Sequence, residues 1–368
     1  MSNNVVTDKS PSVSSDHNAD RLAVASNSQR EKSLLQVKGL STSVGGLTLI
    51  DDIDFSVSLN QTVGVVGESG SGKSTLGLSL LQLVGTGRGQ GDNKVRYQGE
   101  VMFDGQDLLK MTDKELRQIR GRDISMILQD PMTSLDPVFS IGSQIEEAIQ
   151  CHGQVSSSEL RERALSALTK VKITEAESRI SAFPHQLSGG MRQRVVGAIA
   201  VSCAPRLLIA DEPTTSLDAT IQMQFLQLLQ DIQAEMGLSI VIVTHDFGVV
   251  AKMCHRVCVM YGGHIVESAD VQTIFKNPAH PYTKALIESR PKLHEKPRRL
   301  ASIAGAPPKP TDNIQGCKFA ARCPQAKPEC TQQRPPAMDL AEGHQVRCWY
   351  PLSGEFPENP LKGDGNAN

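Results

Sequence analysis

Long apolar runs are missing from this sequence. Hydrophobic residues make up 39% of its 368 residues, yet no uninterrupted apolar stretch approaches the roughly 18–20 residues that a membrane-spanning helix needs. The N-terminal residues are polar and lack the apolar segment of a secretory signal. We therefore expect a chain that does not cross a bilayer by itself and that stays in the cytosol.

An excess of charge of one sign is missing as well. The chain carries 38 Lys and Arg against 40 Asp and Glu, a formal net charge of −2, so its composition does not favour nucleic acid or another polyanion as a partner. At 368 residues the chain is long for a single core, which favours two domains. Residues 1–33 are rich in Ser, Asn and Asp and contain no aromatic residue, which predicts a disordered tail.

The most specific motif is a phosphate-binding loop of the pattern G-x-x-x-x-G-K-S/T. Its residues are Gly67, Glu68, Ser69, Gly70, Ser71, Gly72, Lys73 and Ser74. An apolar run at 62–66 precedes the loop and a helical pattern at 74–81 follows it, which is the context that the motif requires. Lys73 would neutralise the β- and γ-phosphates, and the Ser74 hydroxyl would hold Mg²⁺. The sequence therefore predicts ATP and Mg²⁺ as cofactors.

Short alternating runs around this loop predict a small antiparallel β-layer. Strands are expected at 34–37, 41–44, 47–50, 54–59, 95–103 and 106–108, with a hairpin at Gly45 and Gly46. Between about 140 and 186 the apolar spacing becomes helical, and helices are expected at 141–150 and 158–170.

Two further buried strands end in polar residues. The run at 207–211 leads to Asp211 and Glu212, and the run at 239–244 leads to His245. Because ligands of parallel α/β sheets bind just beyond the carboxyl ends of the strands, we expect these residues to lie beside Gly67. The sequence therefore predicts one site that combines a phosphate loop, a Mg²⁺ ligand, a carboxylate base and a histidine.

With these motifs in order, the chain resembles the ATP-binding subunit of an ABC transporter. Further motifs carry the resemblance, namely Gln129, the signature at Leu187-Ser188-Gly189-Gly190 and the turn at Ser216-Leu217-Asp218. The resemblance covers about residues 34–262 and implies an α/β fold of the P-loop NTPase class. It also implies an antiparallel β subdomain, a helical subdomain at about 130–200 and a small Cys-containing C-terminal extension at 263–368.

The resemblance implies a role for each residue of the site. The implied catalytic set is Lys73, Gln129, Glu212 and His245. Glu212 would polarise the attacking water, His245 would contact the γ-phosphate, and Gln129 would sense the water and the metal. Asp211 would hold Mg²⁺ together with Ser74 and Gln129. The implied nucleotide-binding set also includes Thr75, Ser188, Gly189, Gly190 and Asp218. In a head-to-tail dimer, the signature would close over the γ-phosphate bound by the partner subunit.

Two segments narrow the resemblance to importers of peptides and nickel. They are residues 189–194 in the signature and residues 275–286 in the extension. The implied function is the ATP-hydrolysing motor of a dipeptide or oligopeptide importer, peripheral to the cytoplasmic face of the inner membrane. Its implied partners are two permease subunits, a second ATPase subunit, identical or related, and a periplasmic or extracellular solute-binding protein.

Other functions remain as alternatives. A nickel or glutathione importer stays open, because the solute-binding protein and the permease select the solute. A soluble ABC ATPase of DNA repair or translation typically has a coiled-coil insert or two nucleotide sites, whereas this chain has one phosphate loop and no long heptad run. A non-catalytic metal-binding regulator is disfavoured by Glu212 and His245.

Half of the eight cysteines lie near the C-terminus, at Cys317, Cys323, Cys330 and Cys348. A disulfide framework is not expected in a reducing cytosol, and the C-x-x-C spacing common in zinc sites is missing. The longer spacing favours an iron–sulfur cluster over zinc or unligated thiols, and the resemblance to peptide-importer ATPases implies a 4Fe–4S cluster. The other cysteines, Cys151, Cys203, Cys254 and Cys258, are expected to be packing residues.

One departure from the family is the absence of an aromatic residue before the phosphate loop. ABC ATPases commonly stack the adenine there, but residues 34–54 contain no Phe, Tyr or Trp, and Val44 stands in the expected place. Base–aromatic stacking is worth about 1–3 kcal/mol in other nucleotide contacts, so we expect weaker adenine selectivity. The loop at 130–137 is expected either as a plain surface loop or as a contact with a permease.

Overall fold

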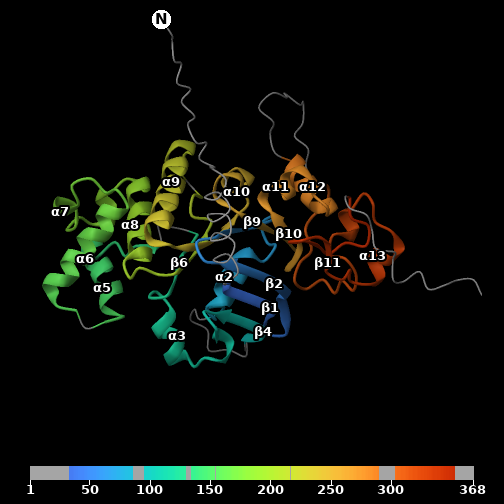
Figure 1. Cartoon of the computed structure of the whole chain (residues 1–368), viewed down its shortest axis with the longest axis horizontal. Helices are drawn as coiled ribbons and strands as arrows, with labels where there is room; N and C mark the ends of the chain where they lie inside the picture. The colour runs from blue at the N-terminus through green and yellow to red at the C-terminus, as the bar shows by residue number, and fades with distance from the viewer. Residues whose placement is uncertain are drawn as a thin grey trace, which may run out of the picture.

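The computed structural model describes residues 33–85, 95–129, 134–153, 155–215, 217–289 and 303–352. The expected tail before Ser33, residues 130–133 of the expected permease-contact loop and Ser216 lie outside the described residues. Along the long axis of Figure 1, the helical segment lies at one end and the C-terminal extension at the other. Helix α2 (Lys73–Leu80), which follows the phosphate-binding loop, lies between them.

The antiparallel layer is a sheet with the strand order β2-β1-β4-β5. Its strands are β1 (Ser33–Val44), β2 (Leu47–Ser58), β4 (Val95–Phe103) and β5 (Gln106–Asp107). The hairpin at Gly45 and Gly46 is confirmed. The sequence predicts breaks between strands at 38–40 and 51–53. These breaks are wrong, because β1 and β2 each continue through them as one strand. Shifts of the pairing register absorb the irregular residues, among them Gly39 with a φ of +57°.

The larger sheet has the order β11-β12-β10-β9-β3-β8-β7-β6. Its parallel part consists of β9 (Arg256–Tyr261), β3 (Thr62–Val66), β8 (Ser239–Thr244), β7 (Leu207–Asp211) and β6 (Ile124–Ile127). β10 (His264–Asp270) returns antiparallel beside β9. Strands β3, β7 and β8 are buried along their whole length, as parallel strands covered on both faces are.

Helices cover both faces of this sheet. Besides α2, the described helices are α3 (Asp113–Ile119), α5 (Ile141–Gln150), α6 (Ser157–Lys170), α7 (Ala176–Arg179), α8 (Gly189–Val201), α9 (Ala219–Met236), α10 (Phe247–Met253), α11 (Val271–Lys276), α12 (Pro281–Glu288) and α13 (Pro328–Gln332). Of these, α9 packs in the core on one face of the sheet, and α2 packs in the core on the other. Short 3₁₀ turns are η1 (Leu108–Lys110), η2 (Pro184–Gln186) and η3 (Ala320–Arg322). None of the described helices is both long enough and apolar enough to span a bilayer.

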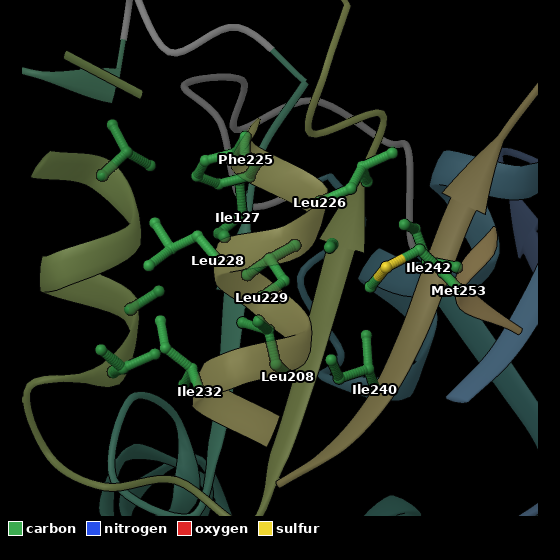
Figure 2. Close-up of a cluster of buried hydrophobic side chains, with 14 of the residues drawn as sticks. Ile127, Leu208, Phe225, Leu226, Leu228, Leu229, Ile232, Ile240, Ile242 and Met253 are labelled. Carbon is green, nitrogen blue, oxygen red and sulfur yellow. The ribbon is translucent and has the colours of Figure 1, made fainter. Parts of the chain in front are cut away.

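Alternate side chains of the central strands face two different cores. Leu208, Ile240 and Ile242 belong to the core that also contains the apolar face of α9 (Figure 2). The buried residues on that face of α9 are Phe225, Leu226, Leu228, Leu229 and Ile232. Ile209 and Val241 belong to the other core, shared with α2 and the antiparallel sheet. Because a slip of one residue would exchange the two faces, burial fixes the register of these strands.

The C-terminal extension continues the central sheet. Its hairpin, β11 (Met338–Ala341) and β12 (His344–Val346), joins the sheet because β12 pairs with β10. Neither strand is predictable from the sequence, since both are short and contain few β-branched residues.

The cysteines outside the extension differ in burial. Cys254 and Cys258 are buried and Cys203 is half-buried, in agreement with a packing role. For Cys151 the expected packing role is wrong, because this residue follows the last turn of α5 and its side chain is exposed.

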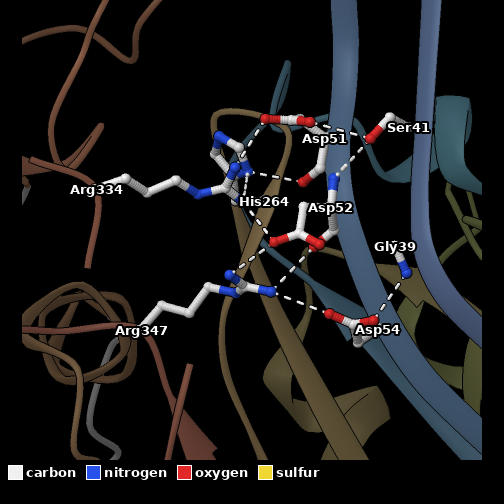
Figure 3. A network of polar contacts seen from close by, with 8 residues as sticks. All are labelled: Gly39, Ser41, Asp51, Asp52, Asp54, His264, Arg334 and Arg347. Atoms are coloured by element: carbon white, nitrogen blue, oxygen red, sulfur yellow. Dashed lines mark hydrogen bonds and ion pairs between the residues drawn. The ribbon is translucent and has the colours of Figure 1, made fainter. Parts of the chain in front are cut away.

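Two arginines of the extension form ion pairs with the acidic stretch of β2 (Figure 3). Arg334 lies 2.9 Å from Asp51 and 3.3 Å from Asp52. Arg347 lies 2.9 Å from Asp52 and 3.0 Å from Asp54. The acidic side chains are partly exposed, so each pair contributes about 1 kcal/mol or less. As a set, the pairs hold the extension against β2.

His264 of β10 lies within the same network. Its Nδ1 is 2.8 Å from the carbonyl oxygen of Asp51 and 2.9 Å from Nη2 of Arg334. Burial, together with the positive charges of Arg334 and Lys318, lowers the pKa of His264 to about 4. The imidazole is therefore neutral in the folded protein at neutral pH.

We predict that stability falls as the pH decreases from 6.5 toward 4. In the unfolded chain His264 has an ordinary pKa of 6.5, whereas the folded protein keeps it neutral down to about 4. Between these two pH values the unfolded chain therefore binds a proton that the folded protein does not. This difference lowers the free energy of unfolding by at most roughly 3 kcal/mol. Denaturant unfolding at a series of pH values measures the loss. His264→Asn should show a shallower decline, and an unchanged decline in this variant would contradict the assignment.

Candidate active site

The phosphate-binding loop runs between β3 and α2 through conformations that require glycine. Gly70 and Gly72 have φ values of +79° and +100°. Gly67 is needed for a different reason, because a Cβ there would lie 2.1 Å from the Met260 carbonyl oxygen and 2.8 Å from the Ser71 hydroxyl. The loop therefore packs directly against the backbone of β9.

Lys73 is the first residue of α2, and only 5% of it is exposed. Its Nζ donates to the carbonyl oxygens of Gly67 and Glu68, both at 2.9 Å. Burial lowers the pKa of Lys73, and the nearby carboxylates oppose this shift. The ammonium group thus lies against the backbone of the loop, where it can neutralise a bound phosphate.

Ser74 and Asp211 connect the loop to the end of β7. The Ser74 hydroxyl donates to Oδ1 of Asp211 at 3.1 Å, and Asp211 is 3% exposed. Burial and the neighbouring Glu212 carboxylate raise the pKa of Asp211, although the bond from Ser74 opposes this. Hydroxyl and carboxylate oxygens are the hard donors that Mg²⁺ prefers, so this pair fits a magnesium ion.

Glu212 occupies a strained backbone position at the end of β7. Its φ is +45°, in the left-handed region that residues other than glycine rarely adopt. Its N–H donates to the carbonyl oxygen of Val243 in β8 at 2.9 Å. Strain of this kind persists where surrounding contacts determine the backbone, and it often marks a functional residue.

Three polar side chains hold the carboxylate of Glu212. Thr215 Oγ1 donates to Oε2 at 2.8 Å and Gln129 Nε2 donates to the same oxygen at 3.2 Å. His245 Nδ1 lies 3.2 Å from Oε1. Burial alone would raise the pKa of Glu212, but the bonds from Thr215 and His245 outweigh it and lower the pKa below its ordinary value. The carboxylate is therefore ionised at neutral pH and fixed through both oxygens.

The signature residues lie at the start of α8. Ser188 caps this helix, and its Oγ accepts the N–H of Met191 at 3.3 Å. Gly190 lies close to α9, since a Cβ there would be 2.8 Å from Ile221. Ser188 and Gly189 are exposed. Within the described ranges, no hydrogen bond joins the signature to the phosphate-binding loop.

Asp218 and Thr75 have local structural partners. Asp218 caps α9, and its Oδ1 accepts the N–H groups of Thr220 and Ile221, both at 3.0 Å. Thr75 lies in α2, where its carbonyl oxygen accepts the Ser79 hydroxyl at 2.6 Å. The structure thus gives Asp218 a capping role, which its place in the turn after β7 had not indicated.

The four C-terminal cysteines line one pocket of about 320 Å³, a volume that includes its opening to solvent. All four are free thiols. Cys330 and Cys348 are buried, and Cys317 and Cys323 are half-buried. In the part of the chain that the structure describes, no group of three or more His, Cys, Asp or Glu side chains is arranged to hold a metal ion. The thiols thus surround a common space without meeting at a single point.

His280 lines the same pocket with an unsatisfied donor. The residue is 1% exposed, and its Nδ1 accepts the N–H of Tyr282 at 3.0 Å. The ring proton is therefore on Nε2, which is buried and has no hydrogen-bond partner among the described residues. An unsatisfied buried donor costs about 1–3 kcal/mol, so the pocket is suited to a group that brings an acceptor.

Sequence reasoning misses several residues that contact the site. Thr215 holds Glu212, and Tyr282 and Arg322 contact Glu68 in the loop. Tyr282 lies in the segment 275–286, whose resemblance to importers of peptides and nickel could have pointed to it. For Arg322 the sequence offers none beyond its position next to Cys323.

These features define a class of protein. A glycine-rich loop that joins a buried parallel strand to a helix, encloses a lysine and adjoins a carboxylate pair is the site of a P-loop nucleotide hydrolase. Two family models match the chain. The model described as ABC transporter matches residues 50–215, and the model described as Oligopeptide/dipeptide transporter, C-terminal region, matches residues 266–330.

Similar curated proteins extend the comparison over most of the chain. A probable peptide ABC transporter ATP-binding protein of Sinorhizobium fredii is 45% identical over 86% of this chain and 94% of its own. The dipeptide transport ATP-binding protein DppD of Escherichia coli is 43% identical over 87% of this chain and 97% of its own. The oligopeptide transport ATP-binding protein AppD of Bacillus subtilis is 43% identical over 86% of this chain and 96% of its own. The chain belongs to the family of peptide ABC transporter ATP-binding proteins.

Solved structures share the fold. The ATP-binding cassette MJ0796, in a dimeric post-hydrolysis state with ADP and Pi, is 26% identical with a TM-score of 0.55, over 64% of this chain and 98% of that chain. The structure of cbiO1 from Clostridium perfringens is 26% identical with a TM-score of 0.56, over 67% of this chain and 92% of that chain. The predicted P-loop fold is confirmed, and the protein is an ABC-type ATPase.

We predict that Gly67→Ala weakens ATP binding at least about tenfold. The added methyl group would collide with the Met260 carbonyl oxygen, so the loop must change shape. Titration with a fluorescent ATP analogue measures the affinity. Gly153→Ala is the matched control, because Gly153 is outside the predicted site and a Cβ there meets only the Val155 side chain, at 3.7 Å. Equal affinities in the two variants would contradict the assigned role of the loop.

Proposed function

We propose that this chain is the ATP-hydrolysing motor of an importer for dipeptides or oligopeptides. The support is an ABC-type site joined to an extension that matches the oligopeptide/dipeptide transporter C-terminal model over residues 266–330. The relatives whose names specify peptide, dipeptide or oligopeptide transport align over 94–97% of their own length. The names of these relatives favour a peptide over nickel or glutathione as the transported solute.

In the proposed reaction, a water molecule attacks the γ-phosphorus of ATP and the bond from this phosphorus to the β–γ bridging oxygen breaks. Glu212 orients the water and accepts its proton, and Gln129 contacts the same water. Lys73 and His245 offset the negative charge on the γ-phosphate oxygens. The observation that carries this proposal is the Glu212 carboxylate held by Thr215, Gln129 and His245 at the end of β7.

Magnesium fits the oxygens of Ser74 and Asp211. These two residues, with Gln129 nearby, would hold the ion, which neutralises β- and γ-phosphate oxygens when it is bound. The hydrogen bond of 3.1 Å between Ser74 and Asp211 keeps the two oxygen ligands side by side.

A second ATPase subunit would complete the site. Ser188 and Gly189 are exposed at the N-terminus of the 13-residue helix α8, where the helix dipole favours an anion. The proposed anion is the γ-phosphate held by that partner, in the manner of a head-to-tail dimer. We assign two permease subunits and a solute-binding protein as further partners, with the chain peripheral to the cytoplasmic face of the inner membrane.

The thiol pocket is the proposed site of a 4Fe–4S cluster, held by Cys317, Cys323, Cys330 and Cys348. Thiols that surround a space favour a cluster over zinc, whose ligand sulfurs lie about 2.3 Å from one ion. The unsatisfied Nε2–H of His280 fits a sulfur-bearing group, because sulfides and thiolates accept such bonds. When bound, the cluster would supply a one-electron redox centre that links η3, α13 and the segment after β12.

We predict that Glu212→Gln lowers ATP turnover at least about hundredfold while ATP still binds. The amide keeps the shape of the side chain but cannot accept the proton of water. Phosphate release measures turnover, and size-exclusion chromatography with ATP should show a trapped dimer. Glu235→Gln, on the exposed face of α9, is the control for the same change of charge. Turnover within tenfold of the wild type would remove Glu212 as the base.

Protein purified without oxygen should contain about four iron atoms per chain and absorb broadly near about 400 nm, with bleaching by dithionite. His280→Asn keeps an acceptor for the Tyr282 N–H but removes the Nε2–H, so the reduction potential should become more negative. His255→Asn is the control, because Nδ1 of His255 likewise accepts a backbone N–H, from Thr62 at 3.0 Å, and His255 does not line the pocket.

Two results would contradict this assignment. A colourless protein with zinc or no metal would exclude the cluster and leave the ATPase proposal unaffected. An unchanged potential in His280→Asn would exclude the histidine as a donor to the cluster.

A further inference from the structure

Glu68 of the phosphate-binding loop is held by two residues of the C-terminal extension. Arg322 forms a two-pronged ion pair with its carboxylate, with Nη1 2.6 Å from Oε2 and Nη2 3.0 Å from Oε1. The Tyr282 hydroxyl accepts the Glu68 N–H at 2.9 Å. Both the backbone and the side chain of this loop residue are therefore fixed by residues that lie 214 and 254 positions later in the chain.

The orientation of Arg322 is itself fixed. Its side chain is 5% exposed. The N–H groups that Glu68 does not use donate to the carbonyl oxygens of Ile303 and Ala304 and to the Tyr261 hydroxyl. The guanidinium carbon also lies 5.7 Å from the centre of the Tyr261 ring. A buried guanidinium with every donor engaged has a single orientation, so Arg322 is a rigid anchor for Glu68.

An uncompensated carboxylate at position 68 would oppose ATP binding. The Glu68 carbonyl oxygen is 2.9 Å from Nζ of Lys73. The carboxylate charges of Glu212, Asp211 and Glu68 also act on the pKa of Lys73, against the larger effect of burial, so the Glu68 carboxylate lies within electrostatic reach of the group expected to bind phosphate. Because like charges repel, an unpaired carboxylate there would weaken the binding of the anionic phosphates. Arg322 neutralises the carboxylate from the side of the extension and leaves the loop open to the nucleotide.

We propose that Arg322 and Tyr282 are positioning residues for the nucleotide loop, so that the affinity for ATP depends on the C-terminal extension. This inference rests on the proposed nucleotide site around Lys73. Arg322 is the last residue of η3 and precedes Cys323 of the thiol pocket. The anchor of the loop is thus part of the turn that lines that pocket.

The first test is Arg322→Met in the full chain, with the affinity for ATP and the steady-state kinetics both measured. Met keeps the apolar stem beside Tyr261 but removes the charge and the donors. We expect the Kd and the KM for ATP to rise at least about tenfold, while kcat at saturating ATP stays within about twofold. A role in folding alone would lower the active fraction and leave the KM unchanged.

Arg347→Met is the matched control. Arg347 also joins the extension to the ATPase core, through Asp52 and Asp54 (Figure 3). Within the described residues, no hydrogen bond or ion pair joins Arg347 to the loop. This variant should bind ATP within about twofold of the wild type. Equal ATP affinities in Arg322→Met and Arg347→Met would overturn the proposal.

Glu68→Gln tests the charge argument by rescue. In this background Arg322→Met should weaken ATP binding by no more than about threefold, because no unpaired carboxylate remains to repel the phosphates. A tenfold loss in both backgrounds would overturn the proposal. If Arg322→Met does not fold, Tyr282→Phe serves instead. A Tyr282→Phe variant that binds ATP as tightly as the wild type would also overturn the proposal.

The outcomes also separate this inference from the proposed function. Wild-type protein that does not bind ATP would contradict the nucleotide site itself. Wild-type protein that binds ATP, together with a Gly67→Ala variant that does not and an Arg322→Met variant that does, would overturn only the role of the extension.

Discussion

The hydrogen-bond register of three neighbouring parallel strands decides where the chemistry lies. β3 pairs with β8 so that Val66 lies opposite Thr244, and β8 pairs with β7 so that Val243 lies opposite Asp211. The three strands therefore end at one edge, and the loop, the acidic pair and the histidine emerge side by side. Because each strand is buried on both faces, a slip of one residue would exchange the side chains of the two cores. Burial of apolar side chains thus fixes the positions of the polar ones.

The site gathers negative charge where an anionic ligand must bind, and each carboxylate has its own compensation. Asp211 accepts a bond from Ser74, and both oxygens of Glu212 have polar partners. Glu68 is neutralised by Arg322. Lys73 then remains the positive group in contact with the backbone of the loop. Each carboxylate of the site thus has a polar or positively charged partner, and the ammonium group of Lys73 lies against the loop backbone.

The C-terminal extension is joined to the ATPase core by ordered contacts of three kinds. β12 prolongs the central sheet beside β10, and Arg334 and Arg347 pair with the acidic stretch of β2. Arg322 and Tyr282 reach the loop itself. Sheet hydrogen bonds and a buried guanidinium are stiff connections, so the extension and the phosphate-binding loop form one continuous structure. The thiol pocket lies within the same extension, one residue away from this anchor.

Contiguous residues were enough to predict the local chemistry. The phosphate loop, the buried strands that lead to Asp211 and His245 and the hairpin at 45–46 were predictable, because each depends on contiguous residues and on strand or helix periodicity. The sequence could not show that β1 and β2 run unbroken, since bulges depend on the partner strand, nor that β12 joins β10. Only the tertiary structure showed that Arg322 meets Glu68. Only it showed that His280 lines the thiol pocket with an Nε2 that has no hydrogen-bond partner among the described residues. Such contacts join residues far apart in the chain, and packing rather than local pattern decides them.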